Sequence, residues 1–565
     1  MTEANALLDL WLEKASDPEI KAELERLKQA GDQAAIDDAF FQNLAFGTAG
    51  LRGVIGAGTN RMNIYMVGRA TQGFSDYLNE HFDELSVAIG RDSRNKGEDF
   101  VRRAAEVFAA NGVKVYLYPR IEPVPALSFA VRDLKCSGGV CVTASHNPAP
   151  YNGYKAYGAD GCQITTEAAK AISAAIDRVD AFDGVKSLDF EEAQQRGLVN
   201  FIGDDTLDRY IDAVYAQSVA MPDNATVGGA PSLKLVYTPL NGSGIELVKR
   251  ILEKVGVTDI TVVPEQEYPD GNFPTCPYPN PEIREALQKG IELCEQVKPD
   301  LLLATDPDAD RVGTAVKNGD DYVLLTGNEM GVLLLDYIAR AKKAAGENLD
   351  DKFAVSTIVS SMMIDALATD YGFSIKRVLT GFKYIGEFIG ALEMQNEADR
   401  FLFGFEESYG YLNGAYVRDK DAVDASMLIC QMAQYYKGQG MNLAQAMDAL
   451  YKRYGYFKNK TVSYSYPGAD GHARMAEIMA DLRNNPPKDI AGYAVERVVD
   501  YAEGVDGLPN ADVIEFCLPG SDKVIVRPSG TEPKIKAYLF AKGETAESAA
   551  DIITEFGAAV DTLLG

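Results

Sequence analysis

Short apolar runs alternate along most of this chain with segments in which apolar residues recur at helical spacing. The runs have the length of buried strands, and helical segments such as 246–255 and 362–371 lie between them. A set of three runs separated by helices recurs three times. The nine predicted strands are 86–89, 113–118 and 138–142 in the first unit, 233–237, 260–263 and 301–304 in the second, and 353–356, 375–379 and 401–403 in the third.

This order of elements predicts the fold class. Strand, helix, strand, helix, strand is typical of an α/β unit with a covered, mostly parallel sheet. We therefore predict an α/β protein with three related α/β domains, whose sheets are mixed and mostly parallel. The last part of the chain differs and predicts a small α+β domain, because a helical pattern at 552–563 follows closely spaced apolar runs at 513–517, 524–526 and 535–540.

The N-terminal stretch is predicted to be helical. Asp17 before Pro18 is typical of a helix start, and Gly31 is typical of a helix end. A chain of 565 residues is long enough for about four domains. We expect them at 1–205, 206–318, 319–453 and 454–565, with the last break around 454–467.

Charge and cysteine content exclude several classes of protein. The formal net charge of −28 argues against a nucleic-acid partner, because the phosphate backbone requires a basic face. A membrane location is not expected either, since no apolar stretch could span a bilayer and the N-terminus lacks the features of a signal peptide. The seven cysteines are widely spaced without a CxxC pair, which indicates reduced thiols in a cytoplasmic protein.

Two loops at the ends of predicted strands carry groups for phosphoryl transfer. The segment 143–148 offers the Ser145 hydroxyl, which could carry a phosphoryl group. Ligands of open α/β sheets bind beyond the carboxyl ends of strands, so this loop is expected to meet the loop that follows 301–304. That second loop offers three carboxylates at alternate positions, which suit Mg²⁺ with a phosphate oxygen in its shell: Asp306, Asp308 and Asp310.

A calcium-binding loop is the alternative for the second segment. Counted from Asp306, such a loop needs Gly at the sixth position and Glu at the twelfth. The chain has Arg311 and Lys317 there. This alternative fails at both positions.

A Ser-His-Asp hydrolase is the alternative for the first segment. His146 is next to Ser145, and we expect adjacent side chains to be poorly placed to bond each other. A triad would then need His81 or His472, and His81 is expected on the surface near a helix end. The histidines therefore argue against a triad.

A phosphorylated substrate would be repelled by the acidic chain unless cations gather at the site. Candidate cations lie in loops that contain Gly or Pro: Arg52, Lys155, Arg311, Lys383, Arg527 and Lys534. The loop 527–534 combines such cations with hydroxyls and Gly530, as a phosphate monoester requires. Glu406 and Ser408, at the end of the strand 401–403, suit sugar hydroxyls.

Taken together, these segments resemble the α-D-phosphohexomutase family, enzymes that move phosphate between C1 and C6 of a hexose. The resemblance runs from Phe46 to the C-terminal helix. It is carried, in the family's order, by the serine loop 143–148, the metal loop 306–311, the sugar loop 404–408 and the phosphate loop 527–534. The N-terminal extension and the segment 418–421 are most similar to the phosphoglucomutase branch. The resemblance implies four domains around a central cleft, which agrees with the threefold pattern.

The resemblance also implies roles for single residues. The segment 47–53 is similar to the family's N-terminal loop, whose arginine faces the reacting phosphate, and 152–155 matches the segment whose lysine assists proton transfer. Such a lysine acts near neutrality only if burial or neighbouring cations lower its pKa. The implied catalytic residues are Ser145, Lys155, Arg52, His146 and Arg311, and the implied metal ligands are Ser145, Asp306, Asp308 and Asp310. The implied substrate-binding residues are Thr380, Gly381, Lys383, Glu406, Ser408, Lys420, Arg527, Ser529, Gly530, Thr531 and Lys534.

The implied reaction interconverts glucose 1-phosphate and glucose 6-phosphate through phosphorylated Ser145 and a 1,6-bisphosphate. Mg²⁺ is the implied cofactor, glucose 1,6-bisphosphate the activator and intermediate, and small sugar phosphates the partners. Three alternatives stay open: phosphomannomutase, phosphopentomutase and glucose-1,6-bisphosphate synthase activity. Mannose differs from glucose only in the configuration of one hydroxyl, which a few hydrogen bonds can distinguish. A phosphatase with a phosphoserine intermediate and a non-catalytic sugar-phosphate-binding protein are the competing classes. The oligomeric state is not predicted.

Overall fold

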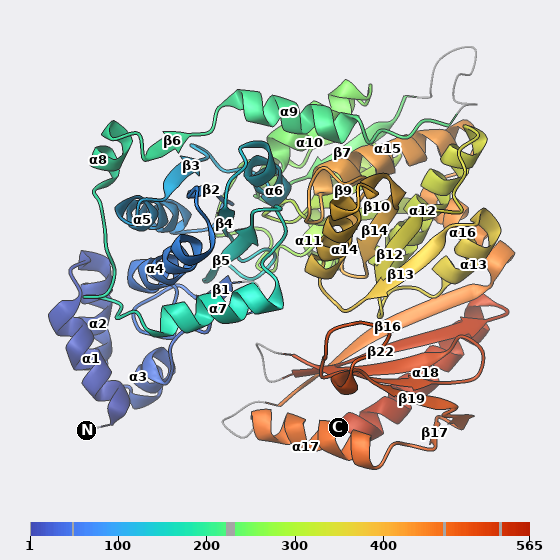
Figure 1. Cartoon of the computed structure of the whole chain (residues 1–565). Helices are drawn as coiled ribbons and strands as arrows, with labels where there is room; N and C mark the ends of the chain where they lie inside the picture. The colour runs from blue at the N-terminus through green and yellow to red at the C-terminus, as the bar shows by residue number, and fades with distance from the viewer. Residues whose placement is uncertain (1, 48–49, 222–231, 467–470, 530–533) are drawn as a thin grey trace.

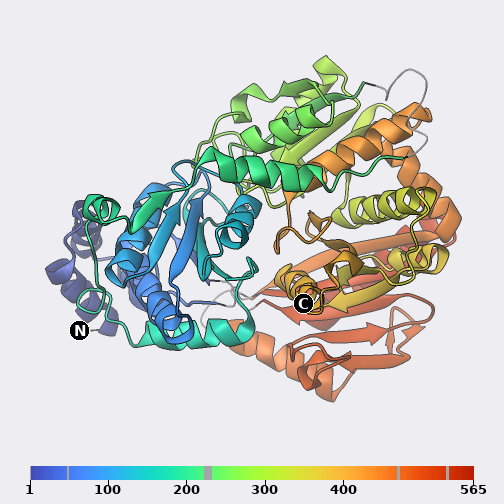
Figure 2. The same cartoon turned by 45° about the horizontal axis from the view of Figure 1, so that its top comes forward.

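The computed structural model describes residues 2–47, 50–221, 232–466, 471–529 and 534–565. It confirms three related α/β units followed by a C-terminal α+β unit (Figure 1). In Figure 2 the first unit lies at the left in blue, the second at the top in green, and the third and fourth at the right in yellow, orange and red. Within the described part of the chain, no helix combines the length and apolar character needed to cross a membrane.

Three helices precede the first sheet and lie at the outer end of the first unit (Figure 1). The second of them starts and ends as predicted. The Asp17 side chain accepts a hydrogen bond from the backbone N–H of Ile20, and Gly31 ends the helix in the left-handed region at φ 63°. The helices are α1 (Glu3–Lys14), α2 (Pro18–Ala30) and α3 (Gln33–Phe40).

The first unit contains a six-stranded sheet in the order β1-β5-β4-β2-β3-β6. The last four strands in this order run parallel, whereas β5 is antiparallel to both of its neighbours. The strands are β1 (Gly50–Val54), β2 (Ser86–Arg91), β3 (Lys114–Leu117), β4 (Gly138–Val142), β5 (Tyr151–Gly158) and β6 (Val199–Phe201). The helices are α4 (Ile64–His81), α5 (Gly97–Ala110), α6 (Val124–Asp133), α7 (Thr166–Asp177) and α8 (Phe190–Gln195).

The second unit has a five-stranded sheet in the order β11-β10-β9-β7-β8, and the third has a four-stranded sheet in the order β13-β12-β14-β15. The second comprises α9 (Asp204–Tyr215), β7 (Lys234–Thr238), α10 (Ile245–Lys254), β8 (Asp259–Val262), α11 (Arg284–Val297), β9 (Leu301–Thr305), β10 (Val312–Asn318) and β11 (Asp321–Leu325). The third comprises α12 (Gly327–Ala344), β12 (Phe353–Thr357), α13 (Met363–Tyr371), β13 (Ser374–Val378), α14 (Lys383–Met394), β14 (Phe401–Glu406), β15 (Gly410–Leu412), α15 (Ala422–Gly438) and α16 (Leu443–Tyr454). All nine predicted strands are thus present.

The three units repeat one arrangement around their third strand. This strand, the third of those predicted for its unit (β4, β9 or β14), pairs in parallel with the first predicted strand (β2, β7 or β12) and is followed by an antiparallel return strand, β5, β10 or β15. The turn into the return strand carries the segments 143–150, 306–311 and 407–409. The return strands were not predicted, and they explain why each of these loops is short and held at both ends.

The C-terminal unit is built on an antiparallel sheet in the order β16-β22-β21-β20-β19. Its strands at 513–540 and its last helix confirm the predicted α+β unit. The stretch 454–467, where we expected a break, contains a ten-residue strand of this sheet. The elements are β16 (Tyr456–Ser465), α17 (Gly471–Asn484), β17 (Asp489–Ile490), β18 (Tyr493–Ala494), β19 (Arg497–Asp500), β20 (Ile514–Cys517), β21 (Lys523–Pro528), β22 (Lys534–Gly543) and α18 (Ala546–Leu564).

Candidate active site

Ser145 lies in the turn between β4 and β5, and its side chain is turned toward the second unit. The residue is 3 % exposed and has a φ of 52°, which is uncommon for any residue other than glycine. Its backbone N–H donates to Oγ1 of Thr143 at 2.8 Å. Its own hydroxyl donates to Oδ2 of Asp306, 3.0 Å away. The two loops that we expected to meet therefore do meet.

His146 contacts the serine that precedes it, contrary to our expectation. Nδ1 of the ring lies 3.1 Å from Oγ of Ser145. Our expectation was wrong because the left-handed backbone at Ser145 turns both side chains to the same side. Burial and the neighbouring charges of Arg311 and Arg52 hold the pKa of His146 well below its ordinary value, so its ring is neutral near pH 7.

The other histidines do not complete a triad. His81 is the last residue of α4, is exposed, and stacks on Tyr77 with 4.2 Å between the ring centroids, as expected for a surface position. The side chain of His472 is outside the described residues. Among the described residues the ring of His146 bonds to no carboxylate.

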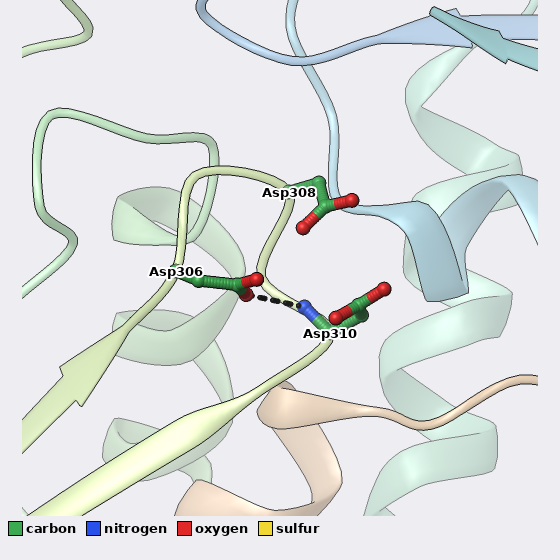
Figure 3. A group of neighbouring side chains, drawn as sticks. All are labelled: Asp306, Asp308 and Asp310. Carbon is green, nitrogen blue, oxygen red and sulfur yellow. Dashed lines mark hydrogen bonds between the residues drawn. The ribbon is translucent and has the colours of Figure 1, made fainter. Parts of the chain in front are cut away.

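Asp306, Asp308 and Asp310 form a buried acidic cluster in the turn between β9 and β10 (Figure 3). One carboxylate oxygen from each lies within 4.8 Å of the others. The backbone N–H of Asp310 donates to Oδ1 of Asp306 at 3.1 Å, which fixes the turn. Within the described structure, Oδ1 of Asp308 and Oδ1 of Asp310 have no hydrogen-bond partner. Buried, unpaired carboxylate oxygens at this spacing fit a divalent cation.

The charges around the cluster affect the pKa of each carboxyl differently. Burial and the charges of Asp308 and Asp310 raise the pKa of Asp306 well above its ordinary value. Burial acts in the same direction on Asp308, but the ammonium of Lys155 outweighs it and lowers the pKa of that carboxyl. The pKa values of these two neighbouring carboxyls are therefore shifted in opposite directions.

Two lysines from different units contact this cluster. Nζ of Lys155, on β5, lies 2.8 Å from Oδ2 of Asp308 and 3.1 Å from Oδ2 of Asp310. Nζ of Lys420, in the third unit, lies 2.8 Å from the same oxygen of Asp310 and 3.3 Å from Oδ1 of Asp419. Lys420, which we expected to bind substrate, is therefore seen on the acidic cluster.

The pKa of Lys155 differs from what a general base requires. Burial alone would lower it, but the carboxylates of Asp308 and Asp310 raise the pKa of Lys155 above its ordinary value. This arrangement does not lower the pKa of Lys155, because the two carboxylates that outweigh burial come from another part of the chain.

Both expected arginines lie at the site. Arg52, on β1, is exposed, and its Nη1 donates to Oδ1 of Asn147, two residues after Ser145. Nη1 of Arg311 lies 3.1 Å from Oε1 of Glu282, and its Nε lies 3.8 Å from Oδ1 of Asp310. Of the segment 47–53, residues 48 and 49 are outside the described residues.

Glu406 ends β14, is buried, and faces the charges of Lys420 and Arg311. Burial raises the pKa of Glu406 to about 7, against the lowering effect of those cations. Ser408 follows in the turn, where its hydroxyl donates to Oε1 of Glu407 at 3.4 Å. This turn therefore carries polar groups toward Arg311 of the second unit.

Lys383 is the first residue of α14, and Thr380 and Gly381 lie in the loop before it. Its Nζ is buried and has no hydrogen-bond partner in the described chain. The ring of Tyr384 lies 4.8 Å from this ammonium. Burial lowers the pKa of Lys383. An unpaired ammonium of this kind suits an anionic ligand.

The fourth loop is only partly described. Arg527 is in β21, and the backbone N–H of Ser529 donates to the carbonyl of Lys534 at 2.7 Å across the ends of the loop. Burial raises the pKa of Tyr384, the neighbour of Lys383, and the charge of Arg527 is among the effects that partly offset this. Gly530 and Thr531 lie outside the described residues.

Sequence reasoning missed three charged residues that support these loops. Asp92 and Arg94 follow β2 and lie against the serine loop, and Glu282 pairs with Arg311. Asp92 and Arg94 carried a usable signal, since they stand at the carboxyl end of a predicted strand, where ligand sites of open sheets form. Glu282 lies in an irregular Pro-rich segment and had none.

Comparison with known proteins gives the same picture over most of the chain. Family models described as phosphoglucomutase/phosphomannomutase α/β/α domains I, II and III match residues 43–182, 208–319 and 326–454. A phosphoglucomutase of Staphylococcus epidermidis is 35% identical over 509 residues, which are 88% of this chain and 90% of that protein. A phosphoglucomutase of Staphylococcus aureus is 33% identical over 94% of this chain and 95% of its own length.

Solved structures show the same fold. A putative phosphomannomutase from Thermus thermophilus has a TM-score of 0.68 and 24% identity, and covers 92% of this chain and 99% of that one. A phosphoglucomutase from Paramecium in an open form has a TM-score of 0.68 and 17% identity, and covers 93% and 96%. Because three family models match in order and two relatives exceed 30% identity over almost the whole length, this chain belongs to the phosphoglucomutase/phosphomannomutase family.

Proposed function

We propose that this enzyme interconverts glucose 1-phosphate and glucose 6-phosphate, with Ser145 as the carrier of the phosphoryl group. The observation that carries the proposal is the position of Oγ of Ser145, 3.0 Å from Asp306 and 3.1 Å from Nδ1 of His146. A hydroxyl in contact with both a neutral imidazole and a cation-binding cluster has the two neighbours that phosphoryl transfer requires. Relatives named phosphoglucomutase support glucose as the sugar.

The reaction consists of two transfers in opposite directions. Phosphorylated Ser145 gives its phosphoryl group to the free hydroxyl of the sugar monophosphate: the P–Oγ bond breaks and a P–O bond to the sugar forms. The sugar hydroxyl gives up its proton to the acid/base group of the site, and Oγ of Ser145 takes up one proton to become a hydroxyl again. The product is glucose 1,6-bisphosphate. After this turns over, its other phosphoryl group returns to Ser145, and the sugar leaves with its phosphate moved.

The chain's own groups handle protons and charge in these steps. Neutral His146 is placed to exchange a proton with Oγ of Ser145. Lys155 is the candidate acid/base on the sugar side, and it can release a proton once its two carboxylate partners are otherwise engaged. Arg52 and Arg311 add positive charge at the reacting phosphate.

The residues for a metal fit Mg²⁺. Asp306, Asp308 and Asp310, with a phosphate oxygen on Ser145, would hold it. When bound, the ion would supply charge that neutralises the transferring phosphoryl group.

Substrate binding involves the third and fourth units. Glu406 and Ser408 would bind sugar hydroxyls, and the segment Thr380, Gly381 and Lys383 would bind the substrate from α14. Arg527, Ser529, Gly530, Thr531 and Lys534 would hold the phosphate that is not reacting. Lys420 would contact substrate when it leaves Asp310.

We propose one function for each of the four domains. The division places the phosphoserine in 1–205, the metal ligands in 206–318, the sugar contacts in 319–453 and the phosphate loop in 454–565. The sheets of the first, third and fourth units support it, since each lies within one of these ranges, whereas the second sheet extends past residue 318 to include β11. The reduced state of the seven free cysteines, six of them buried, supports a place in the cytoplasm.

The test removes the hydroxyl oxygen of Ser145. Ser145→Ala should abolish formation of glucose 6-phosphate from glucose 1-phosphate in the presence of Mg²⁺ and traces of glucose 1,6-bisphosphate. The matched control is Ser137→Ala, also buried and in the same unit but before β4, which should keep full activity. Retained turnover in Ser145→Ala would rule out the carrier role.

Two further measurements separate the alternatives. Steady release of inorganic phosphate without isomerised sugar would indicate a phosphatase. Rates on glucose, mannose, glucosamine and ribose 1-phosphates, measured side by side, would decide the sugar.

A further inference from the structure

A single arginine donates hydrogen bonds to several backbone carbonyls of the serine loop. Arg94 follows β2 and is 3 % exposed. Its Nη1 donates to the carbonyls of Pro148 at 3.0 Å and Tyr151 at 2.9 Å. Its Nη2 donates to the carbonyls of Ser145 and Asn147. Four carbonyls within a seven-residue stretch thus converge on one guanidinium.

The loop needs such an anchor because its backbone is strained. A left-handed conformation at a residue with a Cβ costs about 1–2 kcal/mol, and Ser145 adopts it at φ 52°. The bond from Arg94 to the carbonyl of Ser145 holds that same peptide unit. A guanidinium offers five donors in a fixed plane, whereas the three donors of an ammonium radiate from one atom and cannot span the same carbonyls.

Arg94 is itself held in place from two sides. Oδ2 of Asp92 lies 3.4 Å from its Nε, and Oδ1 of Asp92 accepts the backbone N–H of Arg94 at 3.0 Å. The ring of Phe273, from the second unit, lies under the guanidinium at 5.2 Å. Among the described residues, the hydrogen bonds and ion pairs of Arg94 reach none of the aspartates of the acidic cluster. Its contacts are with the carrier loop rather than with the proposed cation site.

We propose that Arg94 is a positioning residue for Ser145: its guanidinium holds the carbonyl side of the serine loop, so that Oγ stays aimed at the acidic cluster. The proposal rests on the carrier role of Ser145 proposed above. Arg94 does not touch the reacting atoms, so it acts on the rate of transfer and not on sugar binding.

The experiment removes the side chain of Arg94 and then adds guanidinium to the solution to replace its charged group. Displacing a reacting group by ~1 Å costs about 100-fold in rate, so kcat of Arg94→Ala should fall by about that factor with a much smaller change in KM. Millimolar guanidinium should restore most of the loss by filling the vacated site, and methylammonium should not. Arg94→Lys keeps the charge and should remain slow, with no rescue.

Arg69→Ala is the matched control. Arg69 is also buried in the first unit, and its Nε donates to a backbone carbonyl, that of Val179, away from Ser145. It should keep its kcat and show no response to guanidinium. Amide hydrogen exchange of 143–151 supplies a readout independent of turnover: it should rise in Arg94→Ala and fall again with guanidinium.

The outcomes are distinct. Full kcat in Arg94→Lys, a loss confined to KM, or equal loss and rescue in Arg69→Ala would each overturn the positioning role. If the wild-type chain shows no mutase activity, the proposed function fails and the exchange of 143–151 still decides the role of Arg94. Should Arg94→Ala fail to fold, Arg94→Lys carries the comparison.

Discussion

The hydroxyl oxygen of Ser145 lies 3.0 Å from Oδ2 of Asp306, although 161 residues separate the two in the chain. Both residues follow the third predicted strand of their units, β4 and β9, at the turn into an antiparallel return strand. The contact is therefore a consequence of the repeated fold: equivalent turns of two units face each other. It joins the proposed carrier to the proposed cation site.

Removal of divalent cations should lower both activity and stability. Three buried carboxylates within 4.8 Å repel one another, and an ion that binds only the folded state raises its unfolding temperature. We expect Mg²⁺ to raise the unfolding midpoint of chelator-treated protein, measured by scanning fluorimetry. Asp308→Asn should lose most of this shift. An equal Mg²⁺ shift in wild type and Asp308→Asn would contradict the assignment of the ligands.

The repeated fold could be predicted from sequence because its buried strands are continuous apolar runs. The return strand β5 was missed, since Tyr151–Gly158 mixes polar and aromatic residues and carries the functional Lys155. Strand β16 was missed for a similar reason: most of Tyr456–Ser465 is half-buried or exposed, so it has no apolar run. Strand prediction from hydrophobicity finds continuous apolar runs and loses strands in which polar and apolar residues are mixed.

The candidate site was predictable in its residues but not in its contacts. The Ser145–His146 contact depends on a left-handed φ, which a rule based on ordinary backbone geometry excludes. The raised pKa of Lys155 depends on carboxylates at 308 and 310, more than 150 positions away. Local sequence determines which groups are present, and only the packing of the units determines which charges they face.

Glu122 should make stability fall as pH rises. Burial raises the pKa of its carboxyl to about 7, against the lowering effect of Arg120, whose Nε lies 2.7 Å away. Between the unfolded value of ~4.3 and about 7, the folded state holds a proton that the unfolded state has lost. The stability from this group is thus fully present below the unfolded pKa and lost as pH rises through 7, by on the order of 3 kcal/mol.

Urea unfolding of Glu122→Gln at about pH 5 and about pH 8 tests this, since the variant cannot titrate and should lose less stability than wild type between the two. Glu246→Gln is the control, because Glu246 also pairs with Arg120 but is half exposed. If the free energy of unfolding changed with pH by the same amount in wild type and in Glu122→Gln, the buried-acid interpretation would be contradicted.

Tyr65→Phe should loosen the N-terminal helices without affecting catalysis. The Tyr65 hydroxyl accepts the backbone N–H groups of Ser16 at 2.7 Å and Asp17 at 2.9 Å, and leaving such donors unpaired costs about 1–3 kcal/mol. Trp11, the only tryptophan, lies 5.5 Å from the Tyr65 ring and reports on this region. Its emission should change at lower urea in the variant than in wild type.

The control for this change is Tyr116→Phe, which removes the hydroxyl of a half-buried tyrosine on β3, away from the N-terminal helices. Its Trp11 transition should match wild type, and both variants should keep full mutase rates at room temperature. Loss of activity in Tyr65→Phe would show that the helices influence the site, and an unchanged Trp11 transition would refute the anchoring role.

Gly271→Ala should separate the first two units where they touch behind the serine loop. A Cβ at this position would lie 2.5 Å from the backbone N of Asn95 and 2.7 Å from the carbonyl O of Ser93. Backbone atoms cannot yield as a flexible side chain can, so the loop that carries Phe273 must shift. Overpacking of this kind costs about 1–3 kcal/mol of stability.

The shift should also reach catalysis, because Phe273 packs on Arg94, which in turn holds Ser145. We expect a lower unfolding temperature and a lower kcat with little change in KM. Gly557→Ala adds the same methyl group in α18, where the nearest heavy atom would be 3.9 Å away, and should be neutral or stabilising by up to about 1 kcal/mol. If Gly271→Ala were as active and as stable as Gly557→Ala, the contact between the units would have no part in positioning the serine.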